Sequence, residues 1–178
     1  INTPSWASES GSPTAVPDGL YAPFDSPENN WSVFLQQLAR TYAPLGIHQW
    51  IIWNEPDIQP NDPGHPHTFE GSVLDYYRMV KIAHLAINDV DENAEIYIGG
   101  LVWWNAIAME RENFLEGFLS VAIDDPTAAD NDYYFDGVSL NITINPNPIN
   151  GFNSTTDSVG DITSTVRLML DEANLDHK

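Results

Sequence analysis

The chain has 178 residues, of which 42% are hydrophobic and 11% aromatic, so it is long and apolar enough for one domain with a sizeable core. Its 26 acidic and 6 basic residues give a formal net charge of −20, which disfavours nucleic acid and anionic membranes as partners and favours a neutral substrate. The absence of cysteine excludes disulfides and thiolate metal sites. No apolar run approaches the roughly 20 residues of a membrane-spanning helix.

Apolar spacing divides the chain into alternating strands and helices. Residues 1–8 have the pattern of a strand end that runs into a loop, and residues 9–29, rich in Ser, Pro, Gly and Asp, form that loop. Helical spacing predicts helices at 31–42, 73–87, 114–122 and 162–173, with Asn29 or Asn30 capping the first and Ser72 with Asp75 forming a capping box on the second. Short runs rich in β-formers predict strands at 47–53, 94–104 and 134–143.

This regular alternation predicts an α/β fold with a parallel sheet and helices outside it. The run WIIW at 50–53 is apolar at consecutive positions, as is typical of a strand that is buried on both faces. The long loops, at 5–29, 54–71, 102–110 and 142–160, all follow the carboxyl ends of predicted strands. Because function gathers at that end of a parallel sheet, we expect the site there.

One of these loops begins with the motif that points to a function. The sequence HQWIIWNEPD, at 48–57, is an apolar strand that closes in Asn54, Glu55 and Pro56. A long loop and a long helix follow it. This arrangement resembles the clan A glycoside hydrolases, which are retaining glycosidases on a (β/α)8 TIM barrel. The resemblance covers nearly the whole chain, with the four predicted strands matching barrel strands three to six.

The resemblance implies a fold, an activity and roles for two residues. The chain is then a single segment, 1–178, of a partial barrel of about four βα units, from an enzyme that cleaves O-glycosidic bonds of a β-linked polysaccharide or oligosaccharide by double displacement. Glu55 corresponds to the general acid/base, and Asn54 to the residue that binds the sugar 2-hydroxyl. The family and the charge together favour a secreted protein.

The sequence departs from the family at two places. Strand six of many such enzymes ends in a His-x-Tyr pattern, whereas this chain has Asn141, Ile142 and Thr143 there. The family's nucleophilic Glu ends strand seven, which would lie beyond Lys178. We therefore expect no catalysis by this chain alone. We also expect its open sheet edges to associate with the missing barrel half or with a second copy.

Retaining hydrolysis uses two carboxyl groups about 5 Å apart, one as nucleophile and one that first donates and later accepts a proton. Burial beside Trp53 would favour a protonated Glu55, although a Glu in this position could also simply end a strand in a solvated turn. Further sugar contacts are expected from Trp6, Trp103, Trp104 and Asn141. One of the adjacent pair Trp103 and Trp104 should face the site, and the other should be core.

No cofactor is predicted. His65 and His67 supply only two ligands for a metal, and the acidic run at 124–132 lacks the spacing of a calcium loop. Two other functions remain open. The first is a non-catalytic carbohydrate-binding or scaffold protein derived from a glycosidase barrel. The second is an unrelated open α/β domain of flavodoxin type, although no predicted strand is followed by a phosphate-binding loop.

Overall fold

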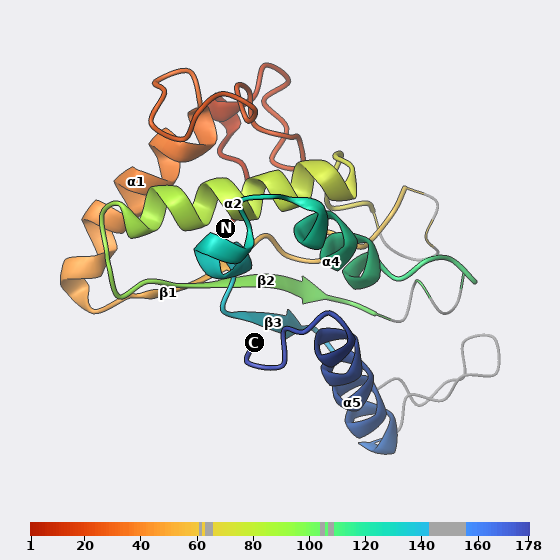
Figure 1. Cartoon of the computed structure of the whole chain (residues 1–178). Coiled ribbons are helices and arrows are strands. Elements are labelled where there is room, and N and C mark those ends of the chain that lie inside the picture. Colours follow the sequence, from red (N-terminus) through yellow and green to blue (C-terminus); the bar gives the residue numbers. More distant parts are fainter. Residues whose placement is uncertain (61, 63–65, 104–105, 107–108, 143–155) are drawn as a thin grey trace.

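Three parallel strands form the sheet at the centre of the molecule (Figure 1). The computed structural model describes residues 1–178 except 61, 63–65, 104–105, 107–108 and 143–155. In this part of the chain the strands are β1 (Gln49–Ile52), β2 (Glu95–Leu101) and β3 (Gly137–Leu140), in the order β1-β2-β3. The helices are α1 (Asn30–Tyr42), α2 (Val73–Asn88), α4 (Phe114–Asp124) and α5 (Thr156–Glu172), with short 3-10 helices at Ser5–Ala7, Ala43–Leu45 and Ala129–Tyr134.

The first two helices begin at side-chain caps. Asn29 accepts a hydrogen bond from the Ser32 amide at the start of α1. At the start of α2, Ser72 and Asp75 satisfy each other's backbone amides in a capping box. Both caps occupy backbone donors that the helix itself leaves free. The predicted starts of these two helices are therefore confirmed.

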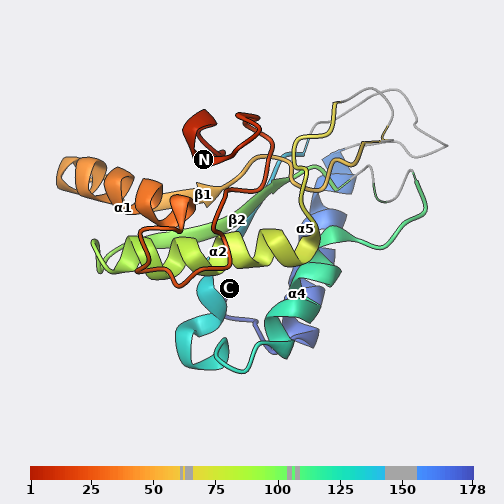
Figure 2. The same cartoon turned by 90° about the horizontal axis from the view of Figure 1, so that it is seen from above.

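The helices cover one face of the sheet and enclose the core (Figure 2). Trp50 and Ile52 of β1 are buried, as are Ile96 and Ile98 of β2, and α2 contacts both strands. On the other face Gln49 is exposed, and Ile51 is 46% exposed. The predicted parallel sheet with helices against it is confirmed, but the expectation that β1 is buried on both faces is wrong.

An ion pair joins the end of α4 to α2. Lys81 of α2 lies 2.5 Å from Asp125, and Tyr77 and Thr127 also donate hydrogen bonds to this carboxylate. Partial burial alone would raise the pKa of Asp125, but the hydrogen bonds from these neighbours outweigh it and hold the pKa below its ordinary value. Asp125 is therefore ionised at neutral pH, and its pair with Lys81 stabilises the packing of α4 against α2.

The predicted fold class, a partial TIM barrel of about four βα units, is wrong. Within the described ranges the sheet has three strands and is open. The expected first strand, at 1–8, contributes only Ile1, whose amino group donates to Ile51 O (3.1 Å) and whose carbonyl accepts from Trp53 N (3.0 Å). Pro4 has no amide hydrogen to continue this pairing, and a 3-10 helix begins at Ser5.

The strands are also shorter than predicted. Gly46 (φ 83°) and Trp53 (φ 72°) have left-handed backbones, which a β-strand does not contain. They lie on either side of β1 and limit it to the four residues Gln49–Ile52. β2 ends at Leu101, before the left-handed Trp103, and β3 begins only at Gly137, after the 3-10 helix. In contrast, α5 begins six residues earlier than predicted, at Thr156 rather than at 162. No helix in the described ranges is long and apolar enough to cross a bilayer.

Candidate functional site at the carboxyl ends of the strands

The turn after β1 has an unusual backbone. Trp53 and Glu55 both adopt left-handed conformations, with φ of 72° and 56°. Non-glycine residues rarely occupy this region, and such strain concentrates at functional sites. The Trp53 indole is buried and donates to Thr68 O (2.9 Å), while the Thr68 hydroxyl donates to the carbonyl of Glu55. The later part of the loop therefore holds the turn in place and leaves the Glu55 side chain half-buried.

Two glycines at the end of β2 let the neighbouring strand ends approach each other. Gly99 and Gly100 have φ of 123° and 62°, and the pairing of β2 with β3 is irregular between Gly99 and Leu101. A Cβ on Gly99 would lie 2.4 Å from Ser139 O, which forbids any side chain there. A Cβ on Gly100 would lie 3.2 Å from side-chain atoms of both Asn54 and Asn141. Gly100 therefore forms the floor beneath these two side chains.

Asn54, Glu55 and Asn141 form one hydrogen-bonded group, here called the Asn-Glu-Asn cluster. Asn141 follows β3, and a hydrogen bond from its backbone N–H to Leu101 O (2.9 Å) holds it in place. Its side-chain nitrogen Nδ2 donates to Asn54 Oδ1 at 3.0 Å and to Glu55 Oε1 at 3.1 Å. The structure thus brings together three of the residues that the sequence nominated, across the ends of β1 and β3.

Asp57 joins the loop after β1 to the end of β2. It is 4% exposed and accepts hydrogen bonds from the amides of Val102 (2.9 Å) and Trp103 (3.0 Å). Arg111 donates to its carbonyl and pairs with Asp62. Burial raises the pKa of the Asp57 carboxyl, although the two amides and the Arg111 charge act in the opposite direction. Asp57 is committed to the backbone and is not free to act on a ligand.

The buried hydroxyl of Tyr76 on α2 ties β1 to β2 directly below the cluster. It donates to Ile52 O at 2.7 Å and accepts from Gly99 N at 2.8 Å. These two bonds satisfy backbone groups at the point where the regular pairing of the sheet stops. Tyr76 therefore sets the spacing of the strand ends that carry the cluster.

The two predicted tryptophans that the structure describes, Trp6 and Trp103, make no hydrogen bond or ring contact with the cluster. Trp6 is 57% exposed, and its ring meets the edge of Phe34 on α1 with 6.2 Å between centroids. In the described part of the chain, no hydrogen bond or ring contact joins Trp6 to the cluster. Trp103 is 5% exposed and belongs to the core, so its indole offers no face to a ligand. Trp104 lies outside the described residues.

Acidic and metal-binding groups are sparse around Glu55. Among the described residues, no ion pair or hydrogen bond links it to another carboxyl group or to a cation. The same residues contain no group of three or more His, Cys, Asp or Glu side chains that could hold a metal ion. His67 lies 3.8 Å from Glu70, and His65 lies outside the described residues.

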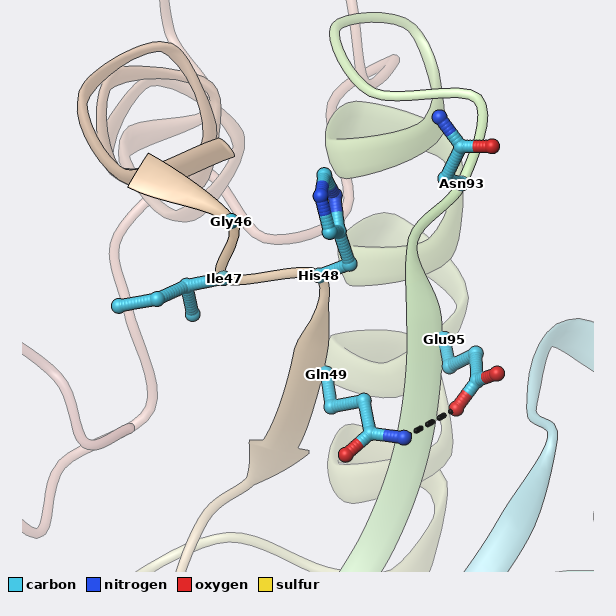
Figure 3. A pocket seen from close by; sticks show the side chains of 6 residues that line it. All are labelled: Gly46, Ile47, His48, Gln49, Asn93 and Glu95. Carbon is cyan, nitrogen blue, oxygen red and sulfur yellow. Dashed lines mark hydrogen bonds between the residues drawn. The ribbon is translucent and has the colours of Figure 1, made fainter. Parts of the chain in front are cut away.

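A hollow of about 570 Å³ lies at the opposite, amino end of the strands. It is lined by residues of β1, of the segment before it and of the start of β2: Gly46, Ile47, His48, Gln49, Asn93 and Glu95. Gln49 and Glu95 bond to each other, whereas Ile47 and His48 point in other directions (Figure 3). His48 pairs with Asp91 at 2.7 Å. The polar groups do not converge on a common point, so we place the candidate site at the carboxyl ends.

Sequence reasoning missed the residues that support the cluster. Asp57 directly follows the Asn-Glu-Pro motif, and the pair Gly99-Gly100 interrupts an apolar strand; both were visible as signals. Tyr76 resembled any other apolar position of its helix, and nothing in the pattern distinguished it.

No protein-family model, curated protein or solved structure matches the chain.

Proposed function

We propose that the Asn-Glu-Asn cluster is part of a glycoside-hydrolysing site, with Glu55 as its general acid/base and a β-linked polysaccharide or oligosaccharide as substrate. The observation that supports this proposal is the hydrogen bonding of the Glu55 carboxylate. One of its oxygens is held by Asn141, while the described residues give the other, Oε2, no hydrogen-bond partner. The left-handed backbone at Glu55 adds support, because strained conformations of non-glycine residues are concentrated at functional sites.

The chemistry assigns Glu55 two successive proton transfers. In the first step a nucleophile attacks the anomeric carbon, the glycosidic C–O bond breaks, and Glu55 gives its proton to the leaving oxygen. In the second step water attacks the same carbon, Glu55 takes the proton of that water, and the nucleophile leaves. Asp57 cannot act as the nucleophile, since it is bound to two backbone amides, so another carboxylate has to fill this role.

The same geometry is compatible with sugar binding without hydrolysis. This second candidate is favoured by one observation: Asp57, the acidic residue nearest to Glu55 in the sequence, is bound to two backbone amides and is not available as a nucleophile. In that case the cluster recognises hydroxyl groups and transfers no proton. Binding would then survive a change that removes the acid.

A chemical rescue separates the two candidates. Azide can replace a missing nucleophile: it attacks the anomeric carbon, the bond between that carbon and the phenolic oxygen breaks, and the general acid protonates the departing phenolate. The chain is assayed with azide on phenyl and 2,4-dinitrophenyl β-glycosides of glucose and xylose. We expect azide-dependent release of phenol, reduced by about 10² or more in Glu55→Gln because general acid catalysis contributes 10²–10⁴-fold. Dinitrophenolate needs no proton, so its release should change much less.

The matched control is Glu172→Gln, the same substitution at an exposed position of α5. It should leave both rates unchanged. Equal rates for Glu55→Gln and the unaltered chain on the phenyl glycosides would refute the acid role. Binding of cellotetraose or xylotetraose that persists in Glu55→Ala, with no azide-dependent release from any substrate, would favour the binding protein.

A further inference from the structure

One amide group holds two side chains of the cluster. The two hydrogens on Asn141 Nδ2 are shared between Asn54 Oδ1 at 3.0 Å and Glu55 Oε1 at 3.1 Å. Both acceptors lie on the turn after β1, whereas the donor comes from the end of β3. The orientation of both side chains therefore depends on a residue from a different strand.

The direction of these bonds fixes which atoms face outward. Asn54 turns its oxygen toward Asn141, so its own nitrogen, a donor, lies at the free end of the amide. Glu55 turns Oε1 inward, so Oε2, an acceptor, lies at the free end of the carboxylate. In the described part of the chain, neither free atom has a hydrogen-bond partner.

We propose that Asn141 is a positioning residue that makes Asn54 and Glu55 present one donor and one acceptor side by side to a hydroxyl-bearing ligand. A hydroxyl group both accepts and donates, so it fits such a pair better than a cation or a carboxylate does. This inference rests on the proposed function for the identity of the ligand. It changes the role of Asn141 from a direct sugar contact to a residue that acts through its two neighbours.

The site tolerates few alternatives at this position. An Asp at 141 has no hydrogen to donate, places a second carboxylate against Glu55, and attracts the nitrogen of Asn54 inward. A Leu removes the donor without adding charge. A Cβ at position 100 would lie 3.2 Å from both side-chain amides, so the two amides already lie close to the backbone of Gly100.

The test is an NMR experiment on the isotopically labelled 178-residue chain without ligand. We expect the side-chain NH2 protons of Asn141 to exchange with water at least about tenfold more slowly than those of Asn2, and to show contacts to the Glu55 side chain. Asn2 is the reference because it is exposed and no described hydrogen bond involves its side chain. Exchange as fast as that of Asn2 would overturn the proposal.

Three variants give a readout that a purely structural role would not produce. In Asn141→Asp the slowly exchanging NH2 signal should move to Asn54, because its amide turns over to bond the new carboxylate. In Asn141→Leu the Asn54 NH2 protons should exchange fast, as in the unaltered chain, and in Asn141→Gln slow exchange should partly return at the side chain of residue 141. The control is Asn2→Asp, which adds the same charge elsewhere. Asn54 NH2 protons that exchange as fast in Asn141→Asp as in the unaltered chain and in Asn2→Asp would overturn the proposal.

The outcome is separable from that of the proposed function. Cellotetraose is titrated into the unaltered chain and Asn141→Asp, and we expect about tenfold weaker binding by the variant, as for the loss of hydrogen bonds near a charged group. A protected Asn141 amide in a chain that binds no sugar would refute the proposed function and leave the positioning role intact. Equal sugar affinity in both chains would refute the positioning role while sugar binding stands.

Discussion

Replacing Tyr76 by Phe should destabilise the protein far more than the loss of one oxygen suggests. The ring stays and fills the same space, so no cavity forms. Two backbone groups, Ile52 O and Gly99 N, lose partners at 2.7 and 2.8 Å in a region from which water is excluded, since Tyr76 is 0% exposed. Each buried group left unsatisfied costs about 1–3 kcal/mol, so we expect a loss of about 3 kcal/mol.

The assay is equilibrium unfolding in urea at pH 7, with the free energy of unfolding compared at constant slope. The matched control is Tyr97→Phe, which removes a hydroxyl bonded to the half-buried Glu95 and should change stability by less than about 1 kcal/mol. Amide exchange at Gly99 should also accelerate in Tyr76→Phe. A loss no greater than that of Tyr97→Phe would show that water reaches these backbone groups and would refute the argument.

Three further changes follow from the contacts described above. Gly100→Ala should cost about 1–3 kcal/mol in urea unfolding, because its φ of 62° is strained for Ala and its Cβ would press on Asn141; an unchanged midpoint would contradict this. The pKa of Asp57 is raised on folding, so its contribution to stability is fully present below its unfolded value and is lost as pH rises through its folded value. Relative to Asp57→Asn, the unaltered chain should therefore gain stability when unfolding is measured at pH 4 instead of pH 7, and an opposite trend would refute the assignment. Lys81→Met should cost about 1–2 kcal/mol at pH 7, as for a partly buried pair. The difference should shrink as pH falls from 3.8, the unfolded pKa of Asp125, through its lower folded pKa; a constant difference would argue against the pair.

Local features of the sequence predicted the helices and the parallel arrangement of the strands. The cap at Asn29 and the capping box at Ser72 act within one turn of chain, so their effect is visible without tertiary information. The same holds for the alternation of helix and strand, which favours a parallel sheet. The extent of the sheet was not visible in this way. Whether residues 1–8 pair with β1 depends on contacts between distant segments.

The barrel expectation failed because it came from a resemblance and not from pairing energies. Ile1 makes the two hydrogen bonds of a parallel neighbour, but Pro4 and the 3-10 helix at Ser5 end the pairing. Three residues that were selected separately from the sequence lie together in the structure. Asn54 and Glu55 were identified from the end of an apolar run, and Asn141 was nominated from the end of another. The bonds between them, and the support from Gly100, follow from the three-dimensional arrangement alone.

The left-handed turn at Glu55 also has an evolutionary consequence. Gly occupies a φ of 56° without strain, so Glu55→Gly should relieve about 1 kcal/mol or more at this position. Random substitution under selection for stability alone would therefore drift toward Gly or Asn here, and away from a carboxylate. A protein that keeps Glu at this turn is less stable than it would be with Gly. A set of natural variants, ranked by thermal stability, would then reveal whether the acid is retained for a use that folding does not require.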